Sequence, residues 1–563
     1  MLSYRKLAMR VLGRPLHTGG GISSPRPASQ RAAAFILTAA MLTTLTAPAF
    51  AGTWYIEDGD ITISAGESGN NVTQNNETTY GDTGTIITNS DKDKASSHTV
   101  TIEAENEGDK VEVKLDNVNI DTSKQNKAAV SVTGSGNTTI ELDGSNTLKS
   151  GSGHAGLEHN KTDTSGELTI QDNDKNGSLK AVGGQFGAGI GGAGAANDAQ
   201  VKITGGKITA TGGEYGGAGI GGGFKGSGDV TITGGEIHAN GGNYGAGIGG
   251  GEYSSGKVTI SGGEINATGG YLGAGIGGGE KGSGDVTITG GEITSATGGK
   301  YGAGIGGGEY SSGKVTIEGN TEVNAAGGTG GAGIGGGYGA KNNSNSTGNQ
   351  ITIRSNENGS PTVNAVGGGT KKGIADIGGA GIGTGCNSNA DTTITLEGKV
   401  TITATAGKDN VAIGDKNGEQ EFNGLAPGSN VTRSDSEGND ISLPGDKVPT
   451  PSGGDSADVS VQESVFPGLV VTDKDGQRIS YTSIRGNNVL SLRVGRFTAS
   501  LHASLSTLRQ LRAEGIETIT FQTILCSTTL SVDELLAMGG EDAEVVLTHH
   551  IRSSTLTVGG KAV

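Results

Sequence analysis

The sequence is poor in cysteine, proline and aromatic residues. Of its 563 residues, 2 are cysteine, 10 are proline and 4% are aromatic, with a single tryptophan. So few cysteines exclude a disulfide framework. So few prolines, beside glycine that has no strict three-residue period, exclude a collagen helix. We expect Cys386 and Cys526 to remain unpaired thiols, and the fold to be stabilised by backbone pairing and packing.

The first 51 residues contain no acidic side chain. They carry six basic residues, then an uncharged apolar run from Ala32 to Leu45, and end in Ala49-Phe50-Ala51. This pattern predicts a secretory signal peptide over residues 1–51. Without it the chain has 35 basic and 58 acidic residues, a net charge of −23, which disfavours binding to nucleic acid or anionic lipid. We expect a secreted, extracellular or cell-surface-associated protein with no transmembrane segment after cleavage.

Glycine is abundant, with 109 copies, and it recurs with a long period. The motif GAGIGG repeats at intervals of 30, 28, 28, 29 and 29 residues, with its isoleucine at Ile190, Ile220, Ile248, Ile276, Ile305 and Ile334. Between motifs, apolar residues alternate in two further short segments, as at Val258 and Ile260 and then at Ile265 and Ala267. Alternation with a period of two predicts strands. Three short strands per unit predict one coil of a parallel β-helix.

The predicted fold is therefore all-β. It is a right-handed parallel β-helix of about ten three-strand coils over residues 52–427, with the most regular coils at 201–337. Glycine is expected at the corners, where the backbone turns sharply or becomes left-handed. Equivalent apolar residues should stack inward as ladders, for example Val230 on Val258. The segment from Thr53 to Ser64 should cap the first coil.

The composition changes after the predicted β-helix. Residues 428–458 include Pro, Gly and Ser in the pattern of a linker. Residues 459–563 are expected to form a small α+β module. In it, Leu501–Arg512 has helical spacing, Glu517–Thr523 alternates as a strand, and Ser531 stands where a helix N-cap is expected. Nothing in the spacing of this module predicts an activity.

Two outward columns of the repeat carry charge. Asp229, Lys257, Asp285 and Lys314 alternate in sign, and a neighbouring column alternates lysine with tyrosine at Lys225, Tyr253, Lys281 and Tyr310. Side chains of adjacent coils are one strand spacing apart, so opposite charges and lysine–tyrosine pairs should be neighbours. These columns are interpreted as ladders that fix the register, with ligand contact as the alternative.

A third column is acidic, with Glu236, Glu264 and Glu292 in successive coils. Like charges about 4.8 Å apart repel one another. The side chains therefore either splay into water or share a cation, and Ca²⁺ is the cation that carboxylate oxygens favour. Both interpretations stay open. The segment Asp172–Gly177 resembles the start of a calcium loop but lacks the glutamate of its twelfth position, which favours a turn between strands.

Aromatic residues recur near the third corner, at Phe186, Tyr215, Tyr244, Tyr271 and Tyr301. Flat rings repeated along a rigid rod suit the faces of sugars, and the amides of Asn243 and Asn266 could bond to hydroxyl groups. These tyrosines and asparagines are the predicted ligand-binding residues. Packing at the corner is the alternative explanation for the rings.

The sequence offers little for catalysis. Its eight histidines are scattered, and it has no H-E-x-x-H, G-x-S-x-G or phosphate-loop lysine motif. Nearly identical coils present the same side chains repeatedly, which favours multivalent binding over a single reactive site. The prediction is therefore a protein without enzymatic activity.

The unit V-T-I-x-G-G-E-I-x-A-x-G-G-x-x-G-A-G-I-G-G-G, as it stands from Val258 to Gly279, resembles the glycine-rich β-helix of secreted bacterial carbohydrate-binding-domain proteins. The stretch from Val111 to Leu148 is similar to their opening coils, so the resemblance covers about residues 55–425. It implies a solenoid like that of pectate lyases, whose relatives bind plant polysaccharide, some of them with calcium. The resemblance assigns no individual residue.

Together these observations predict an exported, non-enzymatic β-helix that binds polysaccharide or host glycan. A structural stalk or adhesin of the bacterial surface is the alternative, with the C-terminal module binding a protein partner. A polysaccharide lyase-like enzyme is the third interpretation.

Overall fold

The computed structural model describes residues 51–562 with several gaps. Outside the description lie residues 1–50, 163, 196–197, 342–347, 370–377, 416, 423–424, 449–467, 475, 480, 486–487, 495, 497, 524–525, 539–542, 551–553 and 563. The predicted signal peptide therefore lies outside the described residues, except for Ala51.

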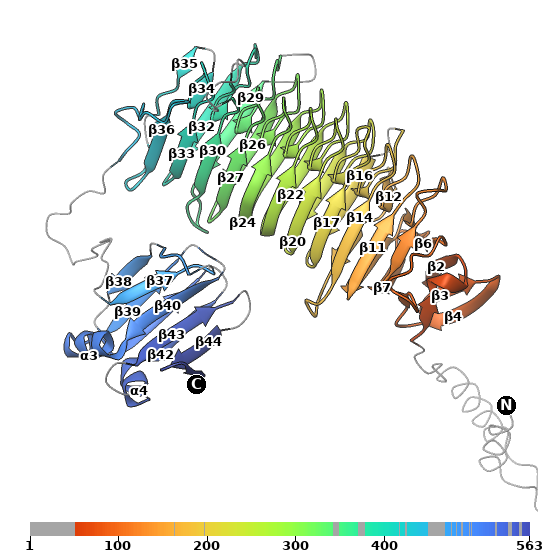
Figure 1. Ribbon diagram of the computed structural model, residues 1–563, viewed down its shortest axis with the longest axis horizontal. Coiled ribbons are helices and arrows are strands. Elements are labelled where there is room, and N and C mark those ends of the chain that lie inside the picture. The colour runs from red at the N-terminus through yellow and green to blue at the C-terminus, as the bar shows by residue number, and fades with distance from the viewer. Residues whose placement is uncertain are drawn as a thin grey trace, which may run out of the picture.

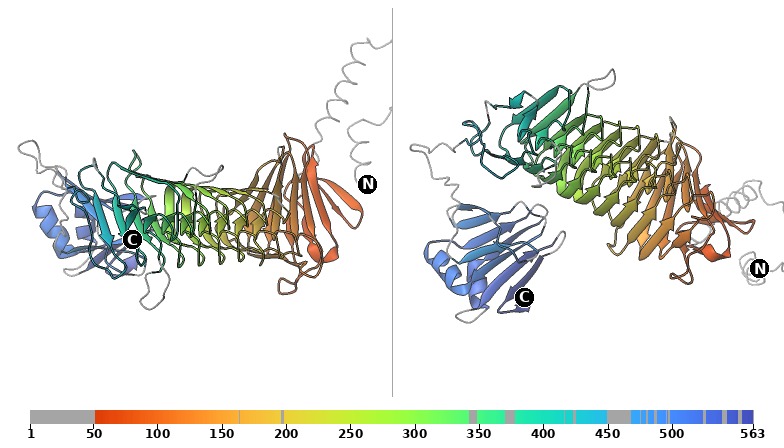
Figure 2. Two further views of the ribbon diagram at one scale, coloured as in Figure 1. Left: turned by 90° about the horizontal axis from the view of Figure 1, so that it is seen from above. Right: turned by 45° about the horizontal axis from the view of Figure 1, so that its top comes forward.

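A parallel β-solenoid makes up most of the described chain (Figure 1). It has about 14 turns, more than the ten predicted over residues 52–427, because further segments join the stack, among them β36 (Asn430–Ser434) beyond the predicted end. The coils follow one another along a single axis, as the two views of Figure 2 show. The predicted fold class is confirmed.

Each regular coil contributes three strands, and equivalent strands pair in parallel to form three ladders. The first ladder contains β1 (Thr53–Tyr55), β5 (Ile86–Thr88), β7 (Lys110–Asp116), β10 (Asn137–Asp143), β13 (Leu168–Gln171), β16 (Asp198–Ile203), β19 (Gly228–Ile232), β22 (Gly256–Thr268), β24 (Gly284–Thr297), β26 (Gly313–Glu318), β29 (Asn349–Arg354) and β32 (Thr392–Glu397). The long strands β22 and β24 continue into the second ladder.

The remaining members of the second ladder are β8 (Asn119–Asp121), β11 (Ser145–Lys149), β14 (Ser178–Val182), β17 (Lys207–Thr211), β20 (Glu236–Asn240), β27 (Glu322–Ala326), β30 (Thr362–Val366), β33 (Thr401–Thr405) and β36 (Asn430–Ser434). The third ladder contains β2 (Ile61–Gly66), β6 (Val100–Ala104), β9 (Val130–Gly134), β12 (Leu157–Lys161), β15 (Ile190–Gly191), β18 (Ile220–Gly221), β21 (Ile248–Gly249), β23 (Ile276–Gly277), β25 (Ile305–Gly306), β28 (Ile334–Gly335), β31 (Ile382–Gly383) and β34 (Ile413–Asp415).

The interior is a narrow stack of valine, isoleucine, leucine and alanine. The predicted ladder of Val230, Val258, Val286 and Val315 is in register, and each of these side chains is fully buried. Glycine allows the backbones to approach closely at the third ladder. Gly277 has φ +133°, and a Cβ there would lie 2.1 Å from the carbonyl oxygen of Gly306 in the next coil. Only glycine fits such a position without strain.

Both ends of the solenoid are capped. At the N-terminal end, β2 pairs antiparallel with β3 (Gly69–Gln74), which pairs with β4 (Glu77–Asp82), next to a 3₁₀ turn at Ile56–Asp58. Trp54 packs against the core and donates its indole N–H to Asp82 at 2.8 Å. The predicted cap is therefore present, and it extends beyond Ser64 because the antiparallel strands are part of it.

At the C-terminal end, β34 pairs with β35 (Gly418–Glu419), and the Arg433 side chain of β36 lies fully buried. Its guanidinium donates to both carboxylate oxygens of Asp446 at 2.8 Å and to Glu419 at 2.8 Å. Burial of an arginine is tolerated because its charge is paired and its donors are bonded. The solenoid thus continues past residue 427 into the stretch predicted to be linker, since β36 pairs with β33.

The described residues of the C-terminal module form two sheets and two helices (Figure 1). One sheet has the order β37 (Leu469–Thr472), β40 (Ala499–Ser504), β43 (Glu544–His549), β44 (Ser554–Val558), β45 (Lys561–Ala562); the other has the order β38 (Thr482–Arg485), β39 (Val489–Arg493), β41 (Thr518–Gln522), β42 (Ser527–Ser531). The helices are α3 (Leu505–Ala513) and α4 (Val532–Ala537). The module has its own hydrophobic core.

Most of the predicted elements of the module are confirmed. β41 matches the predicted strand, and Ser531 caps α4 by accepting the N–H of Glu534 at 3.4 Å. The helix predicted from Leu501 begins at Leu505 instead, because the residues before it pair with β37 and β43 in β40. Cys386 and Cys526 do not form a disulfide. Within the described residues, no helix is long and apolar enough to cross a membrane.

Candidate functional site

The short strands of the third ladder are each flanked by two loops, and these loops converge on one edge of the solenoid. Backbone hydrogen bonds join loops of adjacent coils. The loop that follows a third-ladder strand in one coil bonds to the loop that precedes the third-ladder strand in the coil before it. Glu252 N–H donates to the carbonyl oxygen of Gly216, and Glu280 N–H donates to that of Tyr244, each at 2.8 Å. We call this edge the aromatic corner, and each bonded pair of loops a level.

The predicted tyrosine series occupies two columns of this corner instead of one. Tyr215 and Tyr271 lie five residues before the isoleucine of the third ladder, whereas Tyr244 and Tyr301 lie four residues before it. The backbone bond from Tyr301 N–H to the carbonyl oxygen of Tyr271 agrees with this offset of one residue. Tyr215 and Tyr271 are exposed, and Tyr244 and Tyr301 are partly buried.

Exposed tyrosines occur in pairs at alternate levels of the corner. Tyr215 and Tyr253 are the sequence neighbours of Gly216 and Glu252, whose backbone hydrogen bond defines one level. Tyr271 and Tyr310 are the neighbours of Leu272 and Glu309, which are bonded in the same way two coils further along. The exposed fractions of these four tyrosines lie between 40% and 51%. Each pair presents one ring from the loop before a strand and one from the loop after a strand. Two coils correspond to roughly 9.5 Å along the solenoid axis.

Polar side chains take the same two positions at the intervening level. Asn243 and Lys281 flank the bond between Glu280 and Tyr244. Asn243 is exposed, and the ammonium nitrogen of Lys281 lies 4.6 Å from the ring centre of Tyr253. The predicted lysine–tyrosine contact is therefore confirmed for Lys281 and Tyr253, whereas the ammonium nitrogen of Lys225 lies 5.1 Å from the ring centre of Phe224. The corner alternates a pair of rings with an amide and an ammonium group.

The structure does not bring Asn266 to this corner. Asn266 lies on β22 within the second ladder, where it pairs in register with His238 of β20. It faces outward on that sheet. Of the two predicted asparagines, only Asn243 lies between the tyrosine pairs.

Inner rings support the exposed tyrosines. Phe186 and Phe224 are 5.6 Å apart between ring centres, and they contact Tyr215 at 5.8 Å and Tyr253 at 6.3 Å. The same arrangement recurs at the second pair, where ring centres lie 5.9 Å apart for Tyr271 and Tyr301, 5.0 Å for Tyr301 and Tyr338, and 6.3 Å for Tyr338 and Tyr310. Two clusters of four rings thus stand on the corner, which we call the first and second ring clusters.

Glutamates are buried between the two ring clusters. Glu252, Glu280 and Glu309 are 7–8% exposed. Each lies four residues after the isoleucine of the repeated motif, and Phe224 and Tyr338 take this position in the coil before and the coil after the three glutamates. Burial, together with the charge of Glu280, raises the pKa of Glu252 and of Glu309. Lys281 pairs with Glu280 at 2.7 Å. The exposed polar groups between the ring pairs are therefore Asn243 and Lys281, and Glu280 holds the ammonium group of Lys281.

Several corner residues hold a left-handed backbone without being glycine. The column contains Tyr253 at φ 61°, Lys281 at φ 55° and Tyr310 at φ 61°. Glycine occupies the same position at Gly339, with φ 65°. A left-handed conformation costs a residue with a Cβ about 1–2 kcal/mol. The column therefore places side chains where glycine would be more stable.

The acidic column lies on the second ladder, at a different edge. Glu236, Glu264, Glu292 and Glu322 are paired in register. Lys207 binds Glu236 at 2.7 Å, and His238 lies 3.1 Å from the same carboxylate. Glu264 is 3.8 Å from Lys474, and Arg496 contacts both Glu292 and Glu322. Basic side chains of the protein itself thus lie against these carboxylates, and their binding of calcium stays a prediction.

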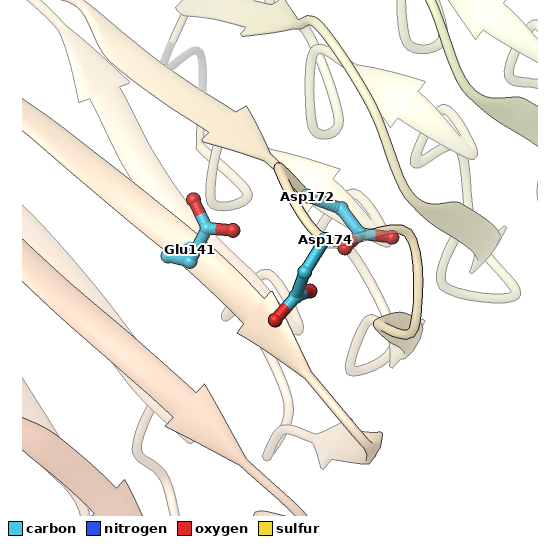
Figure 3. A group of neighbouring side chains, drawn as sticks. All are labelled: Glu141, Asp172 and Asp174. Carbon is cyan, nitrogen blue, oxygen red and sulfur yellow. The ribbon is translucent and has the colours of Figure 1, made fainter. Parts of the chain in front are cut away.

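A closer set of carboxylates lies between β10 and the loop after β13 (Figure 3). Glu141, Asp172 and Asp174 place one oxygen each within 4.8 Å of one another, and no other such group of three acidic, histidine or cysteine residues occurs in the described part of the chain. Burial raises the pKa of Asp172. Asp172 also accepts the N–H of Gly177 at 3.1 Å, so the predicted turn is present.

The alternating charge column also forms as predicted. Lys257 binds Asp229 at 3.3 Å, and Lys314 binds Asp285 at 3.0 Å. These pairs join adjacent coils. They are exposed, so each contributes at most about 1 kcal/mol, and their main effect is on register.

Comparison with known proteins agrees with the architecture. A family model described as beta helix repeat matches residues 201–224, 230–252, 258–280, 286–309 and 315–338. The central part of the chain is a parallel β-helix. No curated protein and no solved structure matches the chain. The matched repeats contain Tyr215, Tyr271 and the three buried glutamates of the aromatic corner, and Tyr253 and Tyr310 each directly follow the last residue of a matched repeat.

Part of this corner was not predicted as a ligand site. Tyr253 and Tyr310 were interpreted mainly as register-fixing residues, and Glu252, Glu280 and Glu309 were not singled out. The signal is present in the sequence, because these residues recur four and five positions after the repeated isoleucine. These positions can be assigned to the same surface as the tyrosines before the isoleucine only when the loops on both sides of the short strand are known to converge.

Proposed function

We propose that this protein is an exported β-helix that binds an extended polysaccharide along the aromatic corner without altering it chemically. One observation carries the proposal: exposed tyrosine pairs recur every second coil, with polar side chains at the level between them. Sugars offer C–H faces to aromatic rings and hydroxyl groups to amides and carboxylates. The corner presents partners for both.

The spacing of the pairs supports a polymer as the ligand. The Tyr215–Tyr253 and Tyr271–Tyr310 pairs are two coils apart, roughly 9.5 Å. An extended β-linked polysaccharide turns over every second sugar and repeats over a comparable length. Successive equivalent sugars would then stack on successive tyrosine pairs, and the intervening sugar would lie beside Asn243 and Lys281.

The backbone strain of the corner supports a role for the side chains. Tyr253 and Tyr310 are held in the left-handed region, although Gly339 shows that glycine fits the same position. Strain of this kind is typical of functional positions. Stability alone would favour glycine, and Lys225 and Lys281 of the same column are held in this conformation too, which supports a role for the side chains of the whole column.

The proposal includes that the protein catalyses no reaction of the bound polysaccharide. The buried glutamates repeat from coil to coil, and Glu252 and Glu309 each lie beside a tyrosine of the same column, so the corner offers the same group more than once and not one unique reactive site. Repetition instead gives several weak contacts to one ligand, and linked contacts strengthen one another.

Affinity electrophoresis of the mature chain, in gels that contain soluble β-linked polysaccharides, tests the proposal. The Tyr271→Ala/Tyr310→Ala variant removes one exposed pair, and we expect its affinity to fall by roughly tenfold, since two ring contacts contribute about 1–3 kcal/mol. Tyr55→Ala/Tyr80→Ala is the matched control, because these tyrosines are also exposed but lie at the N-terminal cap. It should bind like the wild type.

Three outcomes would contradict the proposal: no retardation in any of the gels, equal loss in both variants, or retention of binding in the corner variant. Incubation of the protein with the retarding polysaccharide, followed by chromatography of the sugar, checks the chemical part. Shortened or unsaturated products would identify an enzyme instead.

A further inference from the structure

The C-terminal module meets the solenoid at the acidic column. Arg496, which precedes β40, contacts Glu322 and lies 4.0 Å from Glu292. Lys474, which follows β37, lies 3.8 Å from Glu264. Three glutamates of the column therefore face two cationic side chains of the module. Arg496 and Glu322 are 174 residues apart in the sequence.

A cleft of about 720 Å³ lies along this contact. The solenoid side is lined by the acidic column and by the glycine turns between its first and second ladders, and the module side by Asp473, Lys474, Arg496 and Thr498. The cleft shows that the two surfaces touch through charged side chains and are not closely packed. The two hydrophobic cores do not merge there, since no core residue of one packs against the other among the described residues.

The charges of the two parts are very unequal. Residues 52–458 carry 26 basic and 48 acidic residues, a net charge of −22, whereas residues 459–563 carry 9 basic and 10 acidic residues, a net charge of −1. The nearly neutral module thus directs two of its cations at a column of like charges on a strongly acidic rod. Burial raises the pKa of Glu292, and the negative charges of Glu322 and Glu264 raise it further. The positive charge of Arg496 opposes this rise.

We propose that the acidic column is the docking site of the chain's own C-terminal module, and that Lys474 and Arg496 act as an ionic latch which opens at high ionic strength. The contact is ionic and partly exposed, so each pair contributes little by itself. Only 19 residues separate Val448 from Gly468 in the sequence, and this covalent connection raises the effective concentration of the module, which allows weak pairs to hold it. When the latch opens, the glutamates of the column become available to external cations.

Small-angle X-ray scattering of the mature chain tests the latch. The screening length falls from about 10 Å at about 0.1 M salt to about 3 Å at about 1 M. We therefore expect the radius of gyration of the wild type to increase between these two conditions. The Lys474→Glu/Arg496→Glu variant should already have the larger radius at the lower salt concentration and should change little when salt is added.

Lys257→Glu/Lys314→Glu is the matched control. It makes the same change in net charge, but its lysines pair with Asp229 and Asp285 within the solenoid. It should keep the compact, salt-sensitive radius of the wild type. Restoring the pair with opposite signs, in Glu322→Arg/Arg496→Glu, should recover part of the compaction.

The proposal is overturned if the wild type has the same radius at both salt concentrations, or if the latch variant stays compact at low salt. It is also overturned if the control opens as far as the latch variant, since net repulsion and not the named contacts would then explain the change. Circular dichroism melts of each variant identify any whose solenoid has unfolded, and the charge-reversed pair then decides the question.

Discussion

The ring centres of Tyr301 and Tyr338 lie 5.0 Å apart, although the two residues belong to successive coils and stand on opposite sides of their third-ladder strands. Tyr338 N–H also donates to the carbonyl oxygen of Tyr301 at 2.8 Å. The loops before and after the short strands therefore form one surface. This relationship turns a series of scattered aromatic residues into two ring clusters of the same design.

Truncation of an inner ring should weaken one ring cluster and leave the other intact. Tyr301 contacts both Tyr271 and Tyr338, so Tyr301→Ala loses two ring pairs, each contributing about 0.5–1.5 kcal/mol. We expect the free energy of unfolding to fall by about 1–3 kcal/mol in chemical denaturation. Tyr244→Ala is the control: it sits in the same column, but no ring contact of Tyr244 is found among the described residues, and it should cost less. Equal losses would show that the ring pairs add nothing to stability.

Glu252 and Glu309 should make the protein more stable in mild acid, because burial raises the pKa of both carboxyl groups. The folded state raises the pKa of Glu309 above the ordinary value, so protonation favours the fold. The resulting stability is fully present below the pKa of the unfolded chain and is lost as the pH rises through the folded pKa. Glu309→Gln should therefore raise the melting temperature at pH 7, and its advantage should vanish near pH 4.

The exposed Glu214, in a loop of the same corner, provides the comparison. Glu214→Gln should leave the melting temperature unchanged across this pH range. If Glu309→Gln destabilises the protein at pH 7, the ionised carboxylate of Glu309 is stabilising in the fold, and the assignment of burial as the dominant influence is wrong.

The regular part of the fold could be predicted from the sequence because one physical rule governs every coil. Val258 and Ile260 alternate with outward residues, glycine follows, and the same pattern recurs after 28 or 29 residues, so the inward ladders could be aligned directly. The end coils are undercounted because strands such as β5 are only three residues long and carry no glycine motif.

The candidate site was predicted less completely because it depends on contacts that are not periodic within one strand. Tyr215 and Tyr244 were treated as equivalent, although the offset of one residue places them in different columns. The expectation that glycine alone fills left-handed corners also failed at Tyr253 and Lys281. The pairing of Arg496 with Glu322 could not be inferred, since no repeat relates the module to the solenoid.

Close backbone approach at the third ladder predicts a severe effect of a single methyl group. A Cβ on Gly277 would lie 2.1 Å from the carbonyl oxygen of Gly306, and φ at Gly277 is +133°. Gly277→Ala must therefore displace a coil or distort the backbone, and we expect it to reduce the free energy of unfolding by about 3 kcal/mol or more. Gly108→Ala is the matched control, because its Cβ would have nothing within 4 Å. A small effect at Gly277 in urea unfolding would show that the coils can move apart easily.

Calcium should raise the melting temperature modestly if carboxylates of the solenoid bind it, because a ligand of the folded state stabilises that state. The sequence offers Glu236, Glu264 and Glu292 as a site in one of two interpretations of the acidic column, whereas the geometry favours Glu141, Asp172 and Asp174, whose oxygens lie within 4.8 Å of one another. Melts with calcium and with chelator should therefore differ in the wild type and in Glu264→Gln, and should coincide in Glu141→Gln. If the melting temperatures with calcium and with chelator coincide only in Glu264→Gln, the calcium site lies in the acidic column. If they coincide in the wild type, neither position binds calcium.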